Sequence, residues 1–111
     1  MEREDYIMAI ELTAAEYEEK VTNSKGLIIL DFYNDNCAQC ESLARELAKV
    51  SEEHPEIPVY SISLIRQPEL VKKHRVMAAP CMFFMKDGAQ VKKTLGYKSK
   101  SSIEELIANF S

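Results

Sequence analysis

The sequence has little of what several classes of protein require. Of its 111 residues only three are glycine and four are proline, and no repeat, low-complexity stretch or proline- and glycine-rich linker divides it. We therefore expect a single domain over residues 1–111. No apolar run approaches the roughly 20 residues of a membrane span, so no membrane partner is expected.

The chain also lacks an excess of positive charge. Fourteen Lys and Arg residues face 18 Asp and Glu residues, for a net charge of −4. A nucleic-acid-binding protein would need an excess of basic side chains on one face, so no nucleic-acid partner is expected. Residues 1–5 are acidic and polar, unlike the basic and then hydrophobic start of an export signal, and a cytoplasmic location is predicted.

Cysteine is too rare for a disulfide-stabilised scaffold. The chain has three cysteines, whereas such scaffolds use four or more in a short secreted chain. In a reducing compartment, a few cysteines instead indicate metal binding or redox catalysis. Their spacing and surroundings must decide between the two.

Hydrophobic periodicity predicts strands that alternate with helices. Strands are expected at residues 6–11, 27–33, 59–64, 81–85 and 90–95. Helices are expected from a capping box at Thr13 to Val21, from Cys37, from Pro68, and in a last segment capped by Ser99 or Ser101. This β-α-β-α-β-α-β-β-α order predicts an α/β fold, with a central mixed sheet flanked by helices on both faces.

The dithiol Cys37-Ala38-Gln39-Cys40 stands where chemistry favours a thiolate. A buried strand and a three-residue turn precede Cys37, which begins an amphipathic helix. The free N–H groups and the dipole of a first helical turn favour negative charge, so Cys37 should lose its proton readily. Cys40 lies one turn further along the apolar stripe, shielded but within disulfide reach. We predict that Cys37 attacks a substrate disulfide and that Cys40 resolves the mixed disulfide.

Two other interpretations of the dithiol stay open at this point. A structural zinc site needs four ligands, and only Cys81, His54 and His74 could add any, so we expect no metal. A binding or adaptor protein without redox activity is the alternative from another class.

Several segments together resemble the thioredoxin family. Residues 30–40 resemble its strand, turn and active-site helix, and residues 76–80 resemble the approach to its cis-proline. Residues 83–88 look like the following strand and hairpin, and Gly96 like the late glycine before the last helix. The resemblance covers residues 7–110 and implies a thioredoxin fold.

The resemblance also implies roles for single residues. Asp31 would be the buried carboxyl group that accepts a proton from Cys40. Pro80 would be the cis-proline that faces the dithiol. The residues expected to contact the substrate are Asn36, Ala79, Pro80 and Gly96.

The implied activity is reduction or exchange of protein disulfides through a reversible Cys37–Cys40 disulfide, with no bound cofactor. Disulfide-containing proteins would be the substrates and a thioredoxin-reductase-type flavoenzyme the electron donor, and the protein is expected to be a monomer. A glutathione-linked, glutaredoxin-like activity is a second alternative.

The chain departs from the family pattern at several positions. Glu41 follows the dithiol, where a nearby carboxylate opposes a thiolate. Arg45 replaces a proline that kinks this helix, so a straighter helix is expected. Ser61 replaces a lysine that pairs with the buried aspartate, so Asp31 should lack that counter-charge. Cys81, directly after Pro80, is either a small buried hydrophobe or an accessory thiol that modulates the pair.

Overall fold

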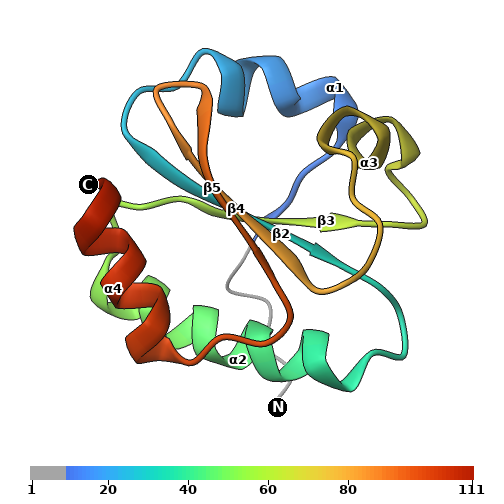
Figure 1. The fold of residues 1–111 in the computed structure, drawn as a ribbon. Coiled ribbons are helices and arrows are strands. Elements are labelled where there is room, and N and C mark those ends of the chain that lie inside the picture. The colour runs from blue at the N-terminus through green and yellow to red at the C-terminus, as the bar shows by residue number, and fades with distance from the viewer. Residues whose placement is uncertain (1–9) are drawn as a thin grey trace.

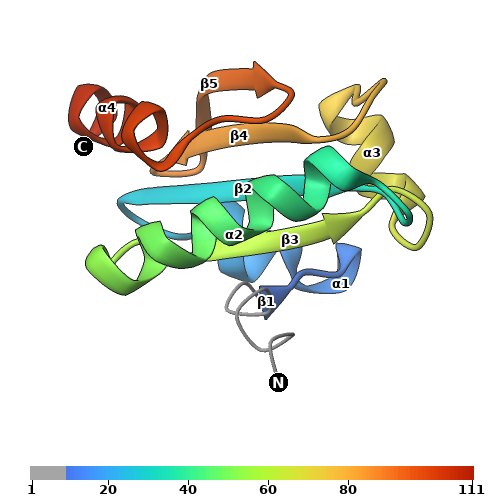
Figure 2. The same ribbon diagram turned by 90° about the horizontal axis from the view of Figure 1, so that it is seen from below.

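A five-stranded mixed sheet forms the centre of the protein (Figures 1 and 2). The structure, a computed structural model, describes residues 10–111. The strand order across the sheet is β1-β3-β2-β4-β5, and the strands are β1 (Ile10–Glu11), β2 (Leu27–Tyr33), β3 (Val59–Ser63), β4 (Cys81–Lys86) and β5 (Ala89–Leu95).

The central strand β2 pairs with a parallel neighbour, β3, and an antiparallel one, β4. Its sequence is almost entirely apolar and all but its last residue are buried, as expected of a strand covered on both faces. The β4–β5 hairpin turns at Asp87 and Gly88, which both have positive φ. Asp-Gly is suited to a turn with positive φ at both central residues, and the twist of such a turn matches that of the flanking strands.

Helices cover both faces of the sheet (Figure 1). Helices α1 (Ala14–Tyr17) and α3 (Pro68–His74) lie on one face, and α2 (Ala38–Glu53) and α4 (Lys100–Phe110) on the other. Side chains of β2 alternate between the two cores: Leu30 packs with the first pair of helices and Ile29 with the second. The predicted α/β architecture is confirmed.

The first predicted strand and helix differ from the structure in detail. Residues 6–9 of the strand predicted at 6–11 lie outside the described part of the chain, and β1 covers its last two residues. The first helix begins after Thr13, whose N–H and hydroxyl both donate to the Glu16 carboxylate at 3.1 Å. It then widens into a π-helical turn, η2 (Glu18–Thr22), because the N–H of Asn23 donates five residues back, to the carbonyl of Glu18.

Helices α2 and α4, on the second face of the sheet, follow their sequence signals. Helix α2 runs without interruption through Arg45, as the absence of proline there predicts. Of the two serines predicted as caps of α4, Ser99 is the one used: its Oγ accepts a hydrogen bond from the N–H of Ser102 at 3.2 Å.

Across residues 10–111, none of the helices combines the length and the apolar character needed to cross a bilayer.

Candidate active site

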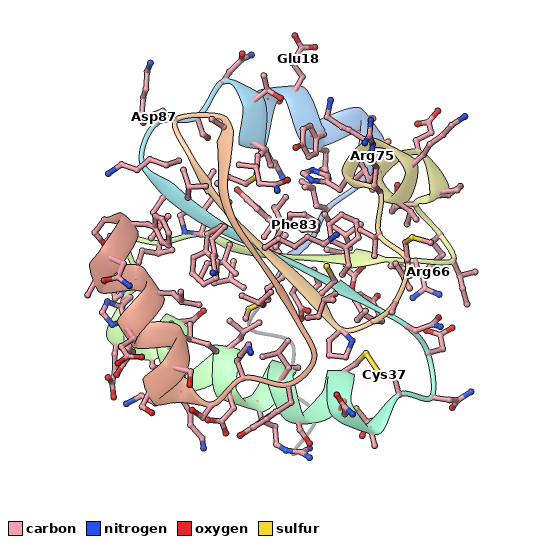
Figure 3. All side chains as sticks on the ribbon, viewed as in Figure 1. Glu18, Cys37, Arg66, Arg75, Phe83 and Asp87 are labelled. Carbon is pink, nitrogen blue, oxygen red and sulfur yellow. A yellow bond between two sulfur atoms is a disulfide. The ribbon has the colours of Figure 1, made fainter. Side chains whose placement is uncertain are left out.

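Cys37 and Cys40 lie at the N-terminal end of α2 and are joined by a disulfide bond (Figure 3). Their Cα atoms are 5.2 Å apart. Cys37 is the N-cap residue, and its Sγ accepts a hydrogen bond from the backbone N–H of Cys40 at 3.1 Å. Cys37 is half-buried, whereas Cys40 is only 5% exposed. The pair is in position for reversible oxidation, with one sulfur open to a partner and the other shielded.

The turn before the dithiol sets this geometry. Strand β2 ends at Tyr33, and three exposed residues lead into α2. Asn36 has φ +52°, a left-handed conformation that asparagine tolerates better than most side chains. The chain therefore reverses within three residues and presents Cys37 at the first turn of the helix.

Pro80 and Gly96 lie next to each other beside the dithiol motif. The Ala79–Pro80 peptide bond is cis, as the family resemblance implies. The carbonyl of Pro80 accepts a hydrogen bond from the N–H of Gly96 at 2.8 Å. A Cβ atom at Gly96 would lie 3.7 Å from Oε1 of Gln39, between the two cysteines, so this glycine borders the motif directly.

Asp31 is a buried carboxyl group whose partners in register on the neighbouring strands, Ser61 and Met82, are uncharged. It is 2% exposed, and within the described structure its Oδ1 accepts no hydrogen bond. Ser61 stands opposite it in the β2–β3 register. Burial raises the pKa of Asp31 to about 7, and the negative charge of Glu11 contributes to this increase.

Glu11, Tyr33 and Arg66 join the site, although the sequence analysis did not predict them there. The Tyr33 hydroxyl donates to Oε2 of Glu11 at 2.7 Å and accepts from Nη2 of Arg66 at 3.1 Å. Glu11 reaches Asp31 because it pairs with Ser61, which in turn pairs with Asp31. Glu11, Ser61 and Asp31 stand in one row across three strands, and this row is the signal that could have identified Glu11. However, the register of a two-residue strand cannot be read from the sequence.

A cavity of about 290 Å³ connects these groups to the dithiol. It reaches Asp31 and Cys40, and it is bounded by β1, β2, β3, the turn after β2 and the start of α2. The lining residues are Glu11, Asp31, Tyr33, Asn34, Asp35, Asn36, Cys40, Glu41, Ala44 and Ser61.

Cys81 takes no part in the disulfide. It is fully buried and free, in the core on the α1 and α3 side of the sheet, whereas Cys40 belongs to α2 on the opposite side. Burial raises the pKa of the Cys81 thiol, the charge of Asp31 raises it further, and Lys93 lowers it. Its accessory role stays a prediction.

One side-chain cluster has the composition of a metal site. Ligand atoms of Glu53, His54 and Glu104 lie within 4.8 Å of one another. However, Nζ of Lys100 lies 2.9 Å from Glu53 and 3.6 Å from Glu104, so an ammonium group already pairs with both carboxylates.

Comparison with known proteins identifies relatives over nearly the full chain. The family model described as thioredoxin matches residues 8–109. The thioredoxin of Listeria monocytogenes is 30% identical over 104 residues, which cover 93% of this chain and 99% of the relative. Thioredoxin-1 of Saccharomyces cerevisiae is 28% identical over 97 residues, 87% of this chain and 93% of the relative. The bifunctional thioredoxin reductase/thioredoxin of Mycobacterium leprae is 27% identical over 97 residues, 86% of this chain and 21% of that longer protein.

The comparisons and the geometry agree. The matched region contains both cysteines, the buried Asp31 and the cis-proline. The predicted thioredoxin fold and the predicted thiol–disulfide oxidoreductase activity are therefore confirmed. The chain belongs to the thioredoxin family.

Proposed function

We propose that this protein reduces or exchanges protein disulfides, with Cys37 as the attacking thiolate and Cys40 as the resolving thiol. The observation that carries this division of roles is the unequal setting of the two sulfurs at the start of α2. Cys37 caps the helix and accepts the N–H of Cys40, an arrangement that favours negative charge on its sulfur. Cys40 is shielded by its burial.

The reaction proceeds through two exchanges that balance in atoms and electrons. The Cys37 thiolate attacks one sulfur of the substrate disulfide, forms a mixed disulfide and releases the first substrate thiolate. Cys40 loses its proton and attacks Sγ of Cys37, which forms the Cys37–Cys40 disulfide and releases the second thiolate. Two electrons pass from the protein to the substrate, and two protons complete the substrate thiols.

Asp31 is proposed as the group that accepts the Cys40 proton. Both residues line the same cavity, which supports this role. A pKa of about 7 lets the carboxyl group take up and release a proton near neutral pH, whereas an ordinary aspartate would be too weak a base.

The substrate is proposed to lie over Asn36, Ala79, Pro80 and Gly96. Large apolar side chains that are exposed flank these positions in the chain: Met77 before Ala79, and Leu95 and Tyr97 around Gly96. Exposed apolar side chains grouped around a reactive centre are suited to contact a protein substrate rather than a small polar molecule.

The oxidised dithiol must be reduced again by an external donor. We assign this step to a thioredoxin-reductase-type flavoenzyme, and the Mycobacterium leprae relative supports the assignment because its name combines a thioredoxin reductase with a thioredoxin. The proposal includes action as a monomer, since one chain supplies both cysteines, Asp31 and the cis-proline. It also includes a cytoplasmic location, where thiols are kept reduced.

Insulin reduction by dithiothreitol, followed by turbidity, tests the proposal. The wild-type protein should accelerate precipitation, and both Cys37→Ser and Cys40→Ser should abolish the acceleration. The two variants differ in a second readout, taken with pre-reduced protein and no dithiothreitol: Cys40→Ser should accumulate a mixed disulfide with an insulin chain, visible by non-reducing electrophoresis, and Cys37→Ser should not. No acceleration by the wild type would favour the adaptor alternative, and a mixed disulfide trapped by Cys37→Ser instead would reverse the two roles.

A further inference from the structure

The cavity beside the dithiol has an uneven charge. Four carboxylates line it, and they come from β1, β2, the following turn and α2: Glu11, Asp31, Asp35 and Glu41. Its lining, taken over residues 10–111, includes no Lys, Arg or His. At the rim, Nη2 of Arg66 lies 3.7 Å from Asp35 and donates to the Tyr33 hydroxyl.

The deepest of these carboxylates has an unused acceptor. Asp31 is almost fully buried, and its Oδ1 accepts no hydrogen bond from any described residue. A buried acceptor without a donor is unfavourable, and one near other negative charges more so. A positive charge that enters the cavity would offset the repulsion among these carboxylates.

We propose that the cavity receives a Lys or Arg side chain of the disulfide-bearing protein partner, from a residue close to its reactive cysteine. The inference rests on the proposed function, because it places the cation next to the mixed disulfide. Cys40 lines the same cavity, so a side chain that enters it lies beside the resolving sulfur.

The shape and chemistry of the cavity suit a long cationic side chain. The Tyr33 ring and Ala44 offer apolar surface to a methylene stem, while the carboxylates of Glu11 and Glu41 offer partners to the charged head. Opposite charges attract more strongly in a recess than on an open surface, and salt weakens the attraction. The partner is therefore recognised by a basic residue near its disulfide.

A set of disulfide peptides tests this. Each peptide has one intramolecular disulfide. The peptides differ at a single position, which holds Lys, norleucine or Glu. This position is placed in turn at each of the two residues before and the two residues after one cysteine. The rate constant for reduction by the reduced protein is measured after acid quenching. At one position and low salt, the Lys peptide should react about tenfold faster than the norleucine peptide, with the Glu peptide slowest, and added salt should reduce the difference.

Two charge-matched variants locate the effect. Glu11→Gln/Glu41→Gln removes two charges from the cavity, and the remaining amide at position 11 can still accept from Tyr33. In this double variant, the ratio of the rate constants for the Lys and norleucine peptides should fall below about twofold. Glu19→Gln/Glu105→Gln removes two exposed charges elsewhere and should keep the preference. The single variant Glu41→Gln, with an intermediate loss, checks that folding is not the cause.

Each other outcome contradicts the inference in a distinct way. Equal rates for the Lys and norleucine peptides at every position, or a preference that survives in Glu11→Gln/Glu41→Gln, would overturn it while leaving the proposed function intact. Loss of the preference with millimolar magnesium, beyond that caused by sodium chloride of equal ionic strength, would point to a metal ion as the occupant. Failure to reduce even the norleucine peptide would overturn the proposed function as well.

Discussion

At the scale of single residues, the buried carboxyl group of Asp31 links the site to stability. Its pKa in the folded protein is about 7, above the roughly 3.9 of an unfolded chain. Between these values the folded state holds a proton that the unfolded state has released. The free energy of unfolding therefore falls as the pH rises through this window, because the carboxylate is costly to bury.

Asp31→Asn removes this titration and should stabilise the protein at alkaline pH. We expect the free energy of unfolding of the variant to exceed that of the wild type by about 2–4 kcal/mol at pH 8. At pH 4 the two values should match closely, because the wild-type carboxyl group is already neutral there. Urea unfolding at the two pH values measures the difference. Asp35→Asn, an exposed carboxylate in the next turn, is the control. A stability gain that is the same at pH 4 and pH 8 would show that Asp31 does not titrate in this window.

The residues of the site were predictable to different degrees. Cys37, Cys40 and Asp31 stand out because each interrupts or borders an apolar pattern. The structure places Asp31 and Cys40 around one cavity and joins Cys37 to Cys40 by a disulfide. Glu11 was not predictable: it lies on the far side of Ser61, and its approach to Asp31 depends on how β1 aligns with β3. Sequence periodicity says which face a residue occupies but not which residue stands beside it.

At the scale of elements, the β4–β5 turn is held against the end of the first helical segment. Gly88 has φ +83°, and a Cβ atom there would collide with the carbonyl oxygen of Thr22. Gly26 has almost the same φ, +85°, but a Cβ atom there would meet nothing within 4 Å. The two glycines therefore share one backbone requirement and differ in their surroundings.

This difference predicts two unequal costs. Gly26→Ala should lower the free energy of unfolding by about 1–2 kcal/mol, the cost of a left-handed conformation for an L-residue. Gly88→Ala should cost at least about 1 kcal/mol more, because the turn must also move away from Thr22. Chemical denaturation of both variants under one set of conditions gives the comparison. Equal losses would mean that the turn does not press on η2.

Element positions followed from the sequence more closely than their internal geometry. The apolar run at 27–33, the Asp87-Gly88 turn and the proline that opens α3 each act locally, and the corresponding elements formed where expected. The π-helical turn at 18–22 was not predictable, since it depends on a backbone hydrogen bond between Asn23 and Glu18 that no side-chain pattern encodes.

At the scale of the whole molecule, the sheet separates two cores, and the dithiol lies at the start of α2, on one side of the sheet. The core between β2 and helices α2 and α4 supports the disulfide through α2, while Cys81 is packed in the other core. Alternation of strands and helices predicted this layered arrangement. The placement of Pro80 and Gly96 beside the dithiol motif required the family resemblance, because these residues come from distant parts of the chain.

The central claim is that the first turn of α2 makes one sulfur reactive and hides the other. Alkylation of the reduced protein by iodoacetamide at pH 7, with the modified cysteine identified by peptide mass mapping, tests this directly. Cys37 should react at least about tenfold faster than Cys40, because it is both more exposed and more readily ionised. Equally slow modification of the two cysteines would contradict the account.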